Sequence, residues 1–360
     1  MDEPVPACET SNEYDGQLGL RISAIFVILV GSGLGALFPV FANRYRNLGV
    51  PDWVFFFVKY FGSGVIVATA FIHLLAPANE ALGEACLADT VIAEYPWPEG
   101  ISLMMIFVLF FIELVVTRIL RKAGRTNNNQ SIKKEDKSLY MLAAKGAGDE
   151  SNSRRASFVP GADHYGHGEQ HVDIEDAFTR DDPTLENYAA QMTAIFVLEF
   201  GVIFHSIFIG LTLAVAGEEF KTLYVVLVFH QTFEGLGLGS RLAVTPWPEK
   251  RSWTPYILAL AYGLATPVAI AIGLGVRESY PPGGQATLIV NGVFDSISAG
   301  ILIYTGLVEL IAHEFMFSRA MMNAPIKLTL LAFGYMSLGA DSHNIYSTFF
   351  SNYLMKDQLM

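Results

Sequence analysis

The sequence reads His205-Ser206-Ile207-Phe208-Ile209-Gly210 in one apolar segment and His230-Gln231-Thr232-Phe233-Glu234-Gly235 in the next. These stretches lie inside runs 194–216 and 223–242, each long enough to cross a bilayer at about 1.5 Å of rise per residue. A charged side chain at the centre of a membrane helix costs about 2.5–3.5 kcal/mol on insertion scales. Histidine and glutamate at this depth therefore indicate a functional site inside the membrane.

The polar residues of these stretches have the spacing of metal ligands. His230 and Glu234 are four residues apart, so they share one face of a helix. His205 can add a nitrogen from the preceding span if the short loop between the spans makes them antiparallel. Imidazole and carboxylate suit zinc, iron(II) or manganese, and the absence of thiols argues against copper(I). A helix–helix hydrogen bond can explain one such histidine. Two histidine-containing stretches of similar pattern, together with Glu234, favour a metal site.

Composition assigns the chain to the multi-span membrane proteins. Of its 360 residues, 52% are hydrophobic and only 16% are charged. Apolar runs repeatedly exceed about 18 residues, which excludes a large soluble domain with an apolar core. The first residues are acidic, whereas a signal peptide needs a basic start, so the first span is expected to serve as its own insertion signal.

Eight transmembrane helices in one bundle are predicted, which makes the chain an all-α integral membrane protein. The predicted spans are 20–41, 53–77, 101–120, 191–216, 222–243, 254–276, 286–312 and 326–347. Residues 1–19 and 348–360 are predicted as polar tails. Residues 121–190 have too few apolar residues for a core and are predicted as a largely disordered loop. Gly31 and Gly35 in the first span have the spacing for close helix packing.

Positive charge predicts the orientation of this bundle. With eight spans, the loops rich in Lys and Arg all fall on one face, which should be cytoplasmic. They follow spans one, three, five and seven, and Arg241 is counted among them. The opposite face carries acidic loops, so those loops and both termini should be extracellular. Cys8 and Cys86 lie on that outer face, where a disulfide and two free thiols are both open.

Further polar residues inside the spans suggest a path for a cation. Glu199 lies seven residues before Ser206, on nearly the same stripe of the fourth span. Three residues share one stripe of the seventh span: Asp295, Ser298 and Glu309. Carboxylates and hydroxyls that face the bundle interior suit a hydrated cation, and structural pairing between helices is the alternative.

Other histidines lie outside the middle of the spans. The long polar loop contains a cluster of three: His164, His167 and His171. Clustered histidines in a flexible segment can hold a metal ion loosely, and a His-rich linker without that role is the alternative. Asp341 and His343, near the outer end of the eighth span, are interpreted as interfacial.

The chain resembles the ZIP family of zinc transporters, and most of all its fungal zinc-regulated plasma-membrane branch. The resemblance covers nearly the whole chain and rests on stretches 68–75, 199–213, 230–239 and 294–306. It implies eight spans, extracellular termini and uptake of a divalent metal into the cytosol. The residues that match the family's transport-site positions are His205, Ser206, His230, Gln231 and Glu234, with His73 at a contributing position in the second span.

Departures from the family pattern bear on the number of metals. Ile209 stands where some members have an acidic residue and bind two metals, and Gln231 replaces a carboxylate or Asn. The middle of the sixth span also lacks a carboxylate. One metal held by His205, His230 and Glu234, with His73 as a further ligand, is therefore expected.

The expected function is transport of Zn²⁺ into the cytosol at the plasma membrane, with zinc as substrate, no cofactor and no catalysis. Uptake of Fe²⁺, Mn²⁺ or Cd²⁺ by the same site stays open. An intramembrane metalloenzyme would need an open coordination position and a general base; a metal-sensing receptor would use the long loop as its output. The expected partners are zinc and the lipid bilayer, with no nucleic acid, and a homodimer stays open.

Overall fold

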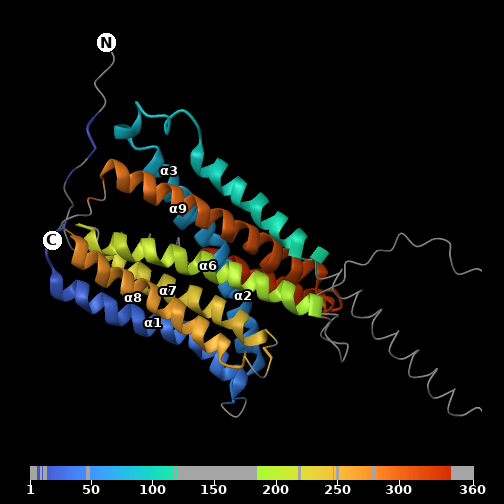
Figure 1. Ribbon diagram of the computed structural model, residues 1–360. Coiled ribbons are helices and arrows are strands. Elements are labelled where there is room, and N and C mark those ends of the chain that lie inside the picture. The colour runs from blue at the N-terminus through green and yellow to red at the C-terminus, as the bar shows by residue number, and fades with distance from the viewer. Residues whose placement is uncertain are drawn as a thin grey trace, which may run out of the picture.

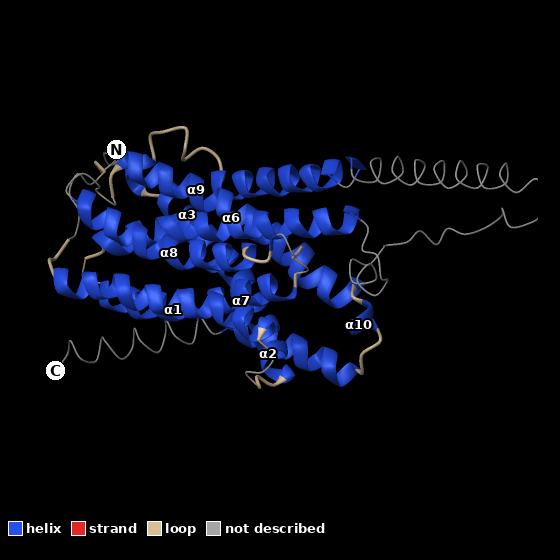
Figure 2. Cartoon of the chain, turned by 60° about the horizontal axis from the view of Figure 1, so that its bottom comes forward, coloured by secondary structure: helices blue, strands red, loops and turns tan. Residues whose placement is uncertain are grey.

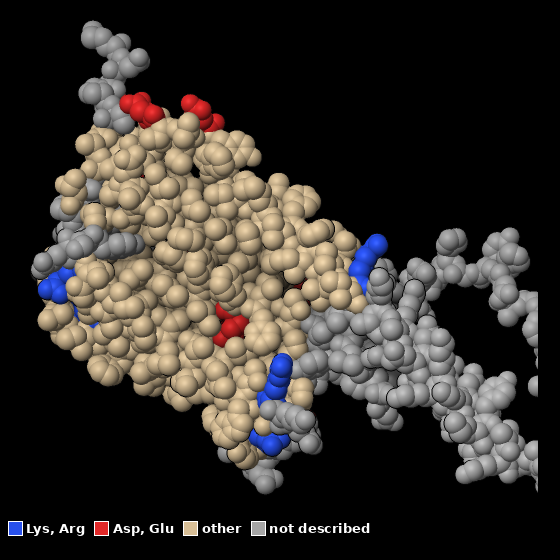
Figure 3. Space-filling view, in the orientation of Figure 1, with Lys and Arg blue, Asp and Glu red and all other residues tan. Residues whose placement is uncertain are grey.

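The computed structural model describes residues 6–8, 10, 14–45, 49–116, 118–119, 185–217, 220–245, 247–248, 251–277, 281 and 283–341. Within these ranges the regular secondary structure is helical, as predicted (Figures 1 and 2). Six helices of this part are long and apolar enough to cross a membrane: Leu18–Arg44, Asp52–Leu82, Trp97–Val116, Met192–Val215, Thr254–Val276 and Gln285–Met316. The chain is therefore an α-helical membrane protein, and most of the face in Figure 3 is uncharged.

The second predicted span is built from three consecutive helical segments. Helix α2 (Asp52–Ala68) continues as the π-helical η2 (Thr69–Leu75) and then as α3 (Ala76–Leu82). The prediction ended this span at Pro77, but Pro77 lies in the first turn of α3, where proline costs little. The helices before and after it in the chain are α1 (Leu18–Arg44) and Trp97–Val116. Each begins a few residues before the start of its predicted span.

The later helices follow the predicted spans with shifted ends. They are α6 (Leu185–Val215), α7 (Phe220–Val244), α8 (Thr254–Val276), α9 (Gln285–Tyr304), the π-helical η6 (Thr305–Phe317), α10 (Arg319–Met322) and a helix over 326–341. Helix α6 begins six residues before the predicted span start at residue 191, because its polar start continues the helix beyond the apolar run. Arg241 lies inside α7 and not in the loop after it, which corrects that assignment.

The helices pack in two groups. In the first group α1 contacts α7 and α8, and α6 contacts α8. In the second group α3 and η2 contact α9. The groups meet where α2 contacts α7 and where α6 contacts α9; Figure 1 shows α1 and α8 at one edge and α3 with α9 toward the other.

The close packing predicted at Gly31 and Gly35 is confirmed. A Cβ atom at Gly31 would lie 2.6 Å from Thr232 Oγ1, and one at Gly35 would lie 2.4 Å from the Thr232 carbonyl oxygen. Gly35 cannot carry a side chain without moving α1 away from α7, because its neighbour is backbone, whereas a side chain at Gly31 would displace the Thr232 hydroxyl. The small residues therefore bring α1 against the polar middle of α7.

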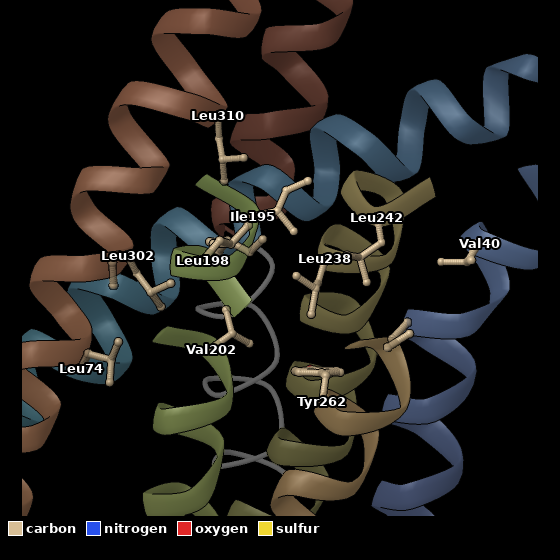
Figure 4. Close-up of a cluster of buried hydrophobic side chains, with 14 of the residues drawn as sticks. Val40, Leu74, Ile195, Leu198, Val202, Leu238, Leu242, Tyr262, Leu302 and Leu310 are labelled. Carbon is tan, nitrogen blue, oxygen red and sulfur yellow. The ribbon is translucent and has the colours of Figure 1, made fainter. Parts of the chain in front are cut away.

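A buried apolar cluster joins the two groups (Figure 4). Its buried members are Ala36, Val40, Ile66, Ala70, Leu74, Met192, Ile195, Leu198, Val202, Leu238, Leu242, Ala259, Tyr262, Ala299, Leu302 and Leu310. Leu74 comes from η2, Leu238 from α7 and Leu302 from α9. Close-packed protein interiors have low compressibility. This cluster therefore holds the helical segments that carry the polar residues at fixed separations.

Arg21 fixes the start of α1 to the end of α6. Its side chain is fully buried. Its guanidinium donates hydrogen bonds to the carbonyl oxygens of Leu213, Ala214 and Ala216, at 3.2, 2.9 and 2.5 Å. The same guanidinium donates to Asp15 at 2.7 Å, and this hydrogen bond holds the pKa of Asp15 below its usual range. Cationic charge at the last carbonyls of a helix is favourable.

The tail before α1 is tied to the connection after α3. Cys8 and Cys86 form a disulfide, which decides between the two alternatives that the sequence left open. Cys86 lies in the short 3₁₀ turn Ala85–Leu87, directly after α3. The bond therefore connects segments adjoining different helix groups.

Candidate metal centre

Three of the predicted histidines come together from three helical segments. The ring centroid of His230 on α7 lies 4.7 Å from that of His73 on η2 and 5.9 Å from that of His205 on α6. His205 is 1% exposed and His230 is 7% exposed. Imidazoles from both helix groups therefore meet in the protein interior.

Glu234 lies beside this group of rings. Its Oε2 atom is 3.8 Å from His230 Nε2, one helical turn away, which confirms the predicted shared face. The carboxylate is fully buried. The hydroxyl of Tyr262 on α8 lies 3.4 Å from the same Oε2 atom. Nitrogen and oxygen donors thus lie together at one depth of the bundle.

The π-helical segment η2 carries His73. Its backbone hydrogen bonds span i to i+5, which widens the turn and shifts the residues that follow relative to an α-helix. Such segments are frequent at functional sites. The sequence predicted an ordinary helix here, because no residue in 69–75 signals the wider turn. The observed contact between His73 and His230 is made within this wider turn.

Several buried polar atoms of this region make no hydrogen bond within the described residues. They are both ring nitrogens of His205, Ser206 Oγ, both side-chain amide atoms of Gln231, and Glu234 Oε1. A buried polar group without a partner costs about 1–3 kcal/mol. The cost is concentrated where the sequence predicts metal binding. The oxygen atoms and the unprotonated ring nitrogen of His205 retain capacity to accept or coordinate, and the Gln231 amide nitrogen retains capacity to donate.

The residues do not form a closed ligand set as they stand. In the described part of the chain, no group of three or more His, Cys, Asp and Glu side chains has the spacing to hold a metal ion. Zinc requires donor atoms at about 2.0–2.2 Å from the metal. Binding among His73, His205, His230 and Glu234 therefore requires side-chain movement.

A second buried carboxylate, after Glu234 on α7, is that of Glu199 on α6. It is 3% exposed, and neither of its oxygens has a hydrogen-bond partner in the described residues. It lies six residues before His205 on the same helix. Its position within the bundle, rather than toward lipid, is compatible with the predicted cation path.

The predicted stripe of the seventh span is interrupted. Asp295 and Ser298 lie on α9, where Ser298 is fully buried. The α-helical register ends at Tyr304, and Glu309 lies in η6. A period of 3.6 residues therefore does not extend from Asp295 to Glu309. Glu309 Oε2 lies 3.4 Å from His313 Nδ1 instead.

A cavity lies between the helix Trp97–Val116, α6 and the junction of α9 with η6. Glu113, Tyr304 and Glu309 supply polar groups to its lining. The Tyr304 hydroxyl donates a hydrogen bond to Glu113 Oε2. The sequence-based prediction did not include Glu113, although a single carboxylate inside an apolar run is a signal that could have identified it.

An ion cluster connects α2, α7 and η6. Glu314 Oε2 lies 2.6 Å from Lys59 Nζ, and Glu314 Oε1 lies 2.6 Å from an Arg241 guanidinium nitrogen. Arg241 also contacts Ser63 Oγ at 3.3 Å. Lys59, the single cation of α2, and Arg241, in the last turn of α7, were the available signals for this cluster.

The other predicted residues are Asp341, His343 and the loop histidines. Asp341 is exposed at the end of the described part of helix 326–341. The loop histidines His164, His167 and His171 lie outside the described residues, and so does His343.

The fold and the buried cluster define an α-helical membrane protein with imidazole and carboxylate side chains in its interior. The family model of the ZIP zinc transporters matches residues 18–341. The chain is 43% identical to zinc-regulated transporter 2 of Saccharomyces cerevisiae, over 94% of this chain and 96% of that one. It is 39% identical to zinc-regulated transporter 1 of Schizosaccharomyces pombe, over 85% and 79% of the two chains. Zinc transporter 9 of Oryza sativa is 31% identical, over 90% and 88%.

The chain belongs to the ZIP family of zinc transporters. This confirms the resemblance seen in the sequence. Family membership also makes the protein a transporter and not an enzyme, with zinc as a substrate and not as a cofactor.

Proposed function

We propose that this protein carries Zn²⁺ across the plasma membrane into the cytosol through a site formed by α6 and α7, with η2 contributing. The observation that supports this most strongly is the meeting of His73, His205 and His230 beside Glu234. Neutral imidazole and carboxylate groups are typical zinc ligands. Ionisable side chains are energetically costly inside a membrane and are rare there except at functional sites. Ser206 and Gln231 lie at the same depth as further polar groups.

The proposed route continues from the site toward the cytosol along the remaining carboxylates. Glu199 on α6 lies toward the predicted cytoplasmic end, and Asp295 and Glu309 follow along α9 and η6. Binding at each step must be strong enough to select the ion and weak enough to release it. The lack of hydrogen bonds to Glu199 within the described residues supports its availability to an ion.

The proposed topology has eight spans with both termini outside the cell. The six long apolar helices support it, and α7 and the helix over 326–341 would supply the other two. Helix α7 is less apolar because its middle carries His230, Gln231 and Glu234. Residues 1–19 and 348–360 would be extracellular tails. Residues 121–190, the last six of which begin α6, would be cytoplasmic, and the loop histidines would bind metal. Uptake of Fe²⁺, Mn²⁺ or Cd²⁺ by the same site and pairing as a homodimer are further parts of this hypothesis left for experiment.

The decisive experiment measures zinc uptake by proteoliposomes that contain the purified protein. Uptake should saturate with zinc concentration and should be lost in Glu234→Ala reconstituted to the same density. Competition by Fe²⁺, Mn²⁺ and Cd²⁺ in the same assay would establish the selectivity. Vesicles that accumulate no more zinc than protein-free vesicles would refute the proposed function.

A further inference from the structure

Tyr262 is a fully buried side chain of α8 and belongs to the apolar cluster that joins the helix groups. Its hydroxyl donates a hydrogen bond to the Gln231 carbonyl oxygen at 2.6 Å. The same hydroxyl lies 3.4 Å from Glu234 Oε2. Both partners belong to α7, so one phenol of α8 contacts the turn of α7 that carries the carboxylate.

The ring of Tyr262 is held against the backbone of α7. A Cβ atom at Gly235 would lie only 2.9 Å from Tyr262 Cε1, so the glycine leaves the space that the ring occupies. Close packing on one side and a 2.6 Å hydrogen bond on the other leave the phenol little freedom. Its single hydroxyl proton is donated to the Gln231 carbonyl, so the fixed phenol anchors the turn of α7 that carries Glu234, with the phenol oxygen 3.4 Å from Glu234 Oε2.

The carboxylate of Glu234 lies between this phenol and His230. Its Oε2 atom is 3.4 Å from the Tyr262 hydroxyl and 3.8 Å from His230 Nε2, while Oε1 has no hydrogen bond within the described residues. A metal-binding carboxylate that is oriented by a neighbouring donor needs less rearrangement to bind. Loss of such an orienting partner reduces metal affinity about 10–100-fold in known sites.

We infer that Tyr262 is a positioning residue for zinc binding, because its hydroxyl anchors the Gln231 carbonyl and lies 3.4 Å from Glu234 Oε2, and so holds the turn of α7 that places the Glu234 carboxylate beside His230. The inference rests on the proposed function, since it takes Glu234 as a ligand. Tyr262 acts through Glu234 and not as a ligand itself. The sequence alone does not reveal this role, because a tyrosine in an apolar span also suits simple packing.

Tyr262→Phe separates the two roles, because it keeps the ring and its packing and removes only the hydroxyl. In proteoliposomes, the zinc concentration for half-maximal uptake should rise about 10–100-fold, with the maximal rate within about twofold of the wild type. Zinc affinity measured by equilibrium binding to the purified protein should fall by the same factor. Tyr256→Phe is the matched control: it lies on the same helix, and its ring packs against Phe41 at 5.0 Å between centroids.

Unchanged zinc affinity in Tyr262→Phe, or a loss of maximal rate with unchanged half-saturation, would overturn the inference. If folded Tyr262→Phe cannot be purified, Tyr262→Met, which also lacks the hydroxyl, goes through the same binding measurement with the same two outcomes. The proposed metal site fails separately, through normal uptake by Glu234→Ala, and the proposed function fails if wild-type vesicles take up no more zinc than protein-free vesicles. Uptake abolished in Glu234→Ala but unchanged zinc affinity in Tyr262→Phe would reject the role of Tyr262 alone.

Discussion

His73 and His230 face each other with ring centroids 4.7 Å apart and ring planes at 61°. His73 belongs to η2, which packs on α9, whereas His230 belongs to α7, which packs on α1. The contact therefore crosses the boundary between the two helix groups. A metal bound at this point would be shared by both groups, so a change in their packing would change the number of ligands available.

The first prediction concerns the proposed ligands. His205→Ala, His230→Ala and Glu234→Ala should each nearly abolish zinc uptake while the protein still reaches the membrane. Each change removes one bond to the metal and leaves the remaining ligands incompletely paired in a medium of low dielectric constant, at a cost of several kcal/mol. Uptake is measured at matched surface expression.

Two comparisons sharpen this prediction. His73→Ala should have an intermediate effect on apparent affinity or metal preference, because His73 comes from the other helix group. Asp341→Asn should be mild, since Asp341 is exposed and is not among the proposed ligands. The double variant His205→Ala/Glu234→Ala should be little worse than either single change, because ligands of one site are not additive. Normal uptake by Glu234→Ala would leave these residues as helix-packing groups.

The second prediction concerns the loop histidines. Replacing His164, His167 and His171 by alanine should change regulation or zinc sensitivity in cells more than it changes intrinsic uptake. The physical reason is that the segment is polar and is expected to lie outside the membrane. The measurement compares uptake in reconstituted vesicles with uptake in cells. A loss in vesicles as large as that of His230→Ala would assign the loop to the transport path.

The third prediction concerns orientation. An epitope tag near residue 140 should be inaccessible to antibody on intact cells and accessible after permeabilisation, because Lys and Arg concentrate on that set of loops. A tag at the N-terminus should show the opposite pattern and serves as the control. Labelling of the tag near residue 140 on intact cells would contradict the eight-span topology.

The fourth prediction concerns the ion cluster around Glu314. Glu314→Gln leaves Lys59 and Arg241 without their shared carboxylate at the junction of α2, α7 and η6. Removing one partner of a largely buried pair costs about 3–5 kcal/mol, so the melting temperature of the detergent-purified protein should fall by several degrees. Glu99→Gln is the control, because Glu99 is exposed and its carboxylate accepts a hydrogen bond from Asn79 at the surface. Equal melting temperatures for the two variants would show that the cluster contributes little.

The positions of the helices could be predicted from the sequence, because long apolar runs report directly on membrane spans. The pairing of His230 with Glu234 could also be predicted, since four residues make one helical turn. The two π-helical segments could not, because a wider turn depends on tertiary packing. Because the wider turn of η6 changes the helical period, Glu309 does not continue the stripe of Asp295.

Contacts between residues distant in the chain were the second limit. Lys59, Arg241 and Glu314 come from three helices, and only the packing of α2 against α7 and η6 brings their charges together. Tyr262 likewise meets Glu234 only because α8 packs near α7. A single sequence marks such residues as unusual in an apolar helix without identifying their partners.

The last prediction concerns the disulfide between Cys8 and Cys86, which closes a loop with a sequence separation of 78 residues. A crosslink of this kind stabilises a protein by typically about 2–4 kcal/mol, chiefly by restricting the unfolded chain. Membrane helices persist in the unfolded state, so the lower end of this range, about 2 kcal/mol, is expected here. A reducing agent should therefore lower the melting temperature of the purified wild-type protein.

Without reducing agent, Cys86→Ser should already have the lower melting temperature of the reduced wild-type protein. Adding the reducing agent should not change its melting temperature further. Cys8→Ser and the double variant should match it, because each removes the same single bond. Half-saturation for zinc should be unchanged in all three, since the disulfide joins the N-terminal tail to the connection after α3 and not the helical segments that carry the proposed ligands. A wild-type melting temperature that ignores the reducing agent would contradict a stabilising role for this bond.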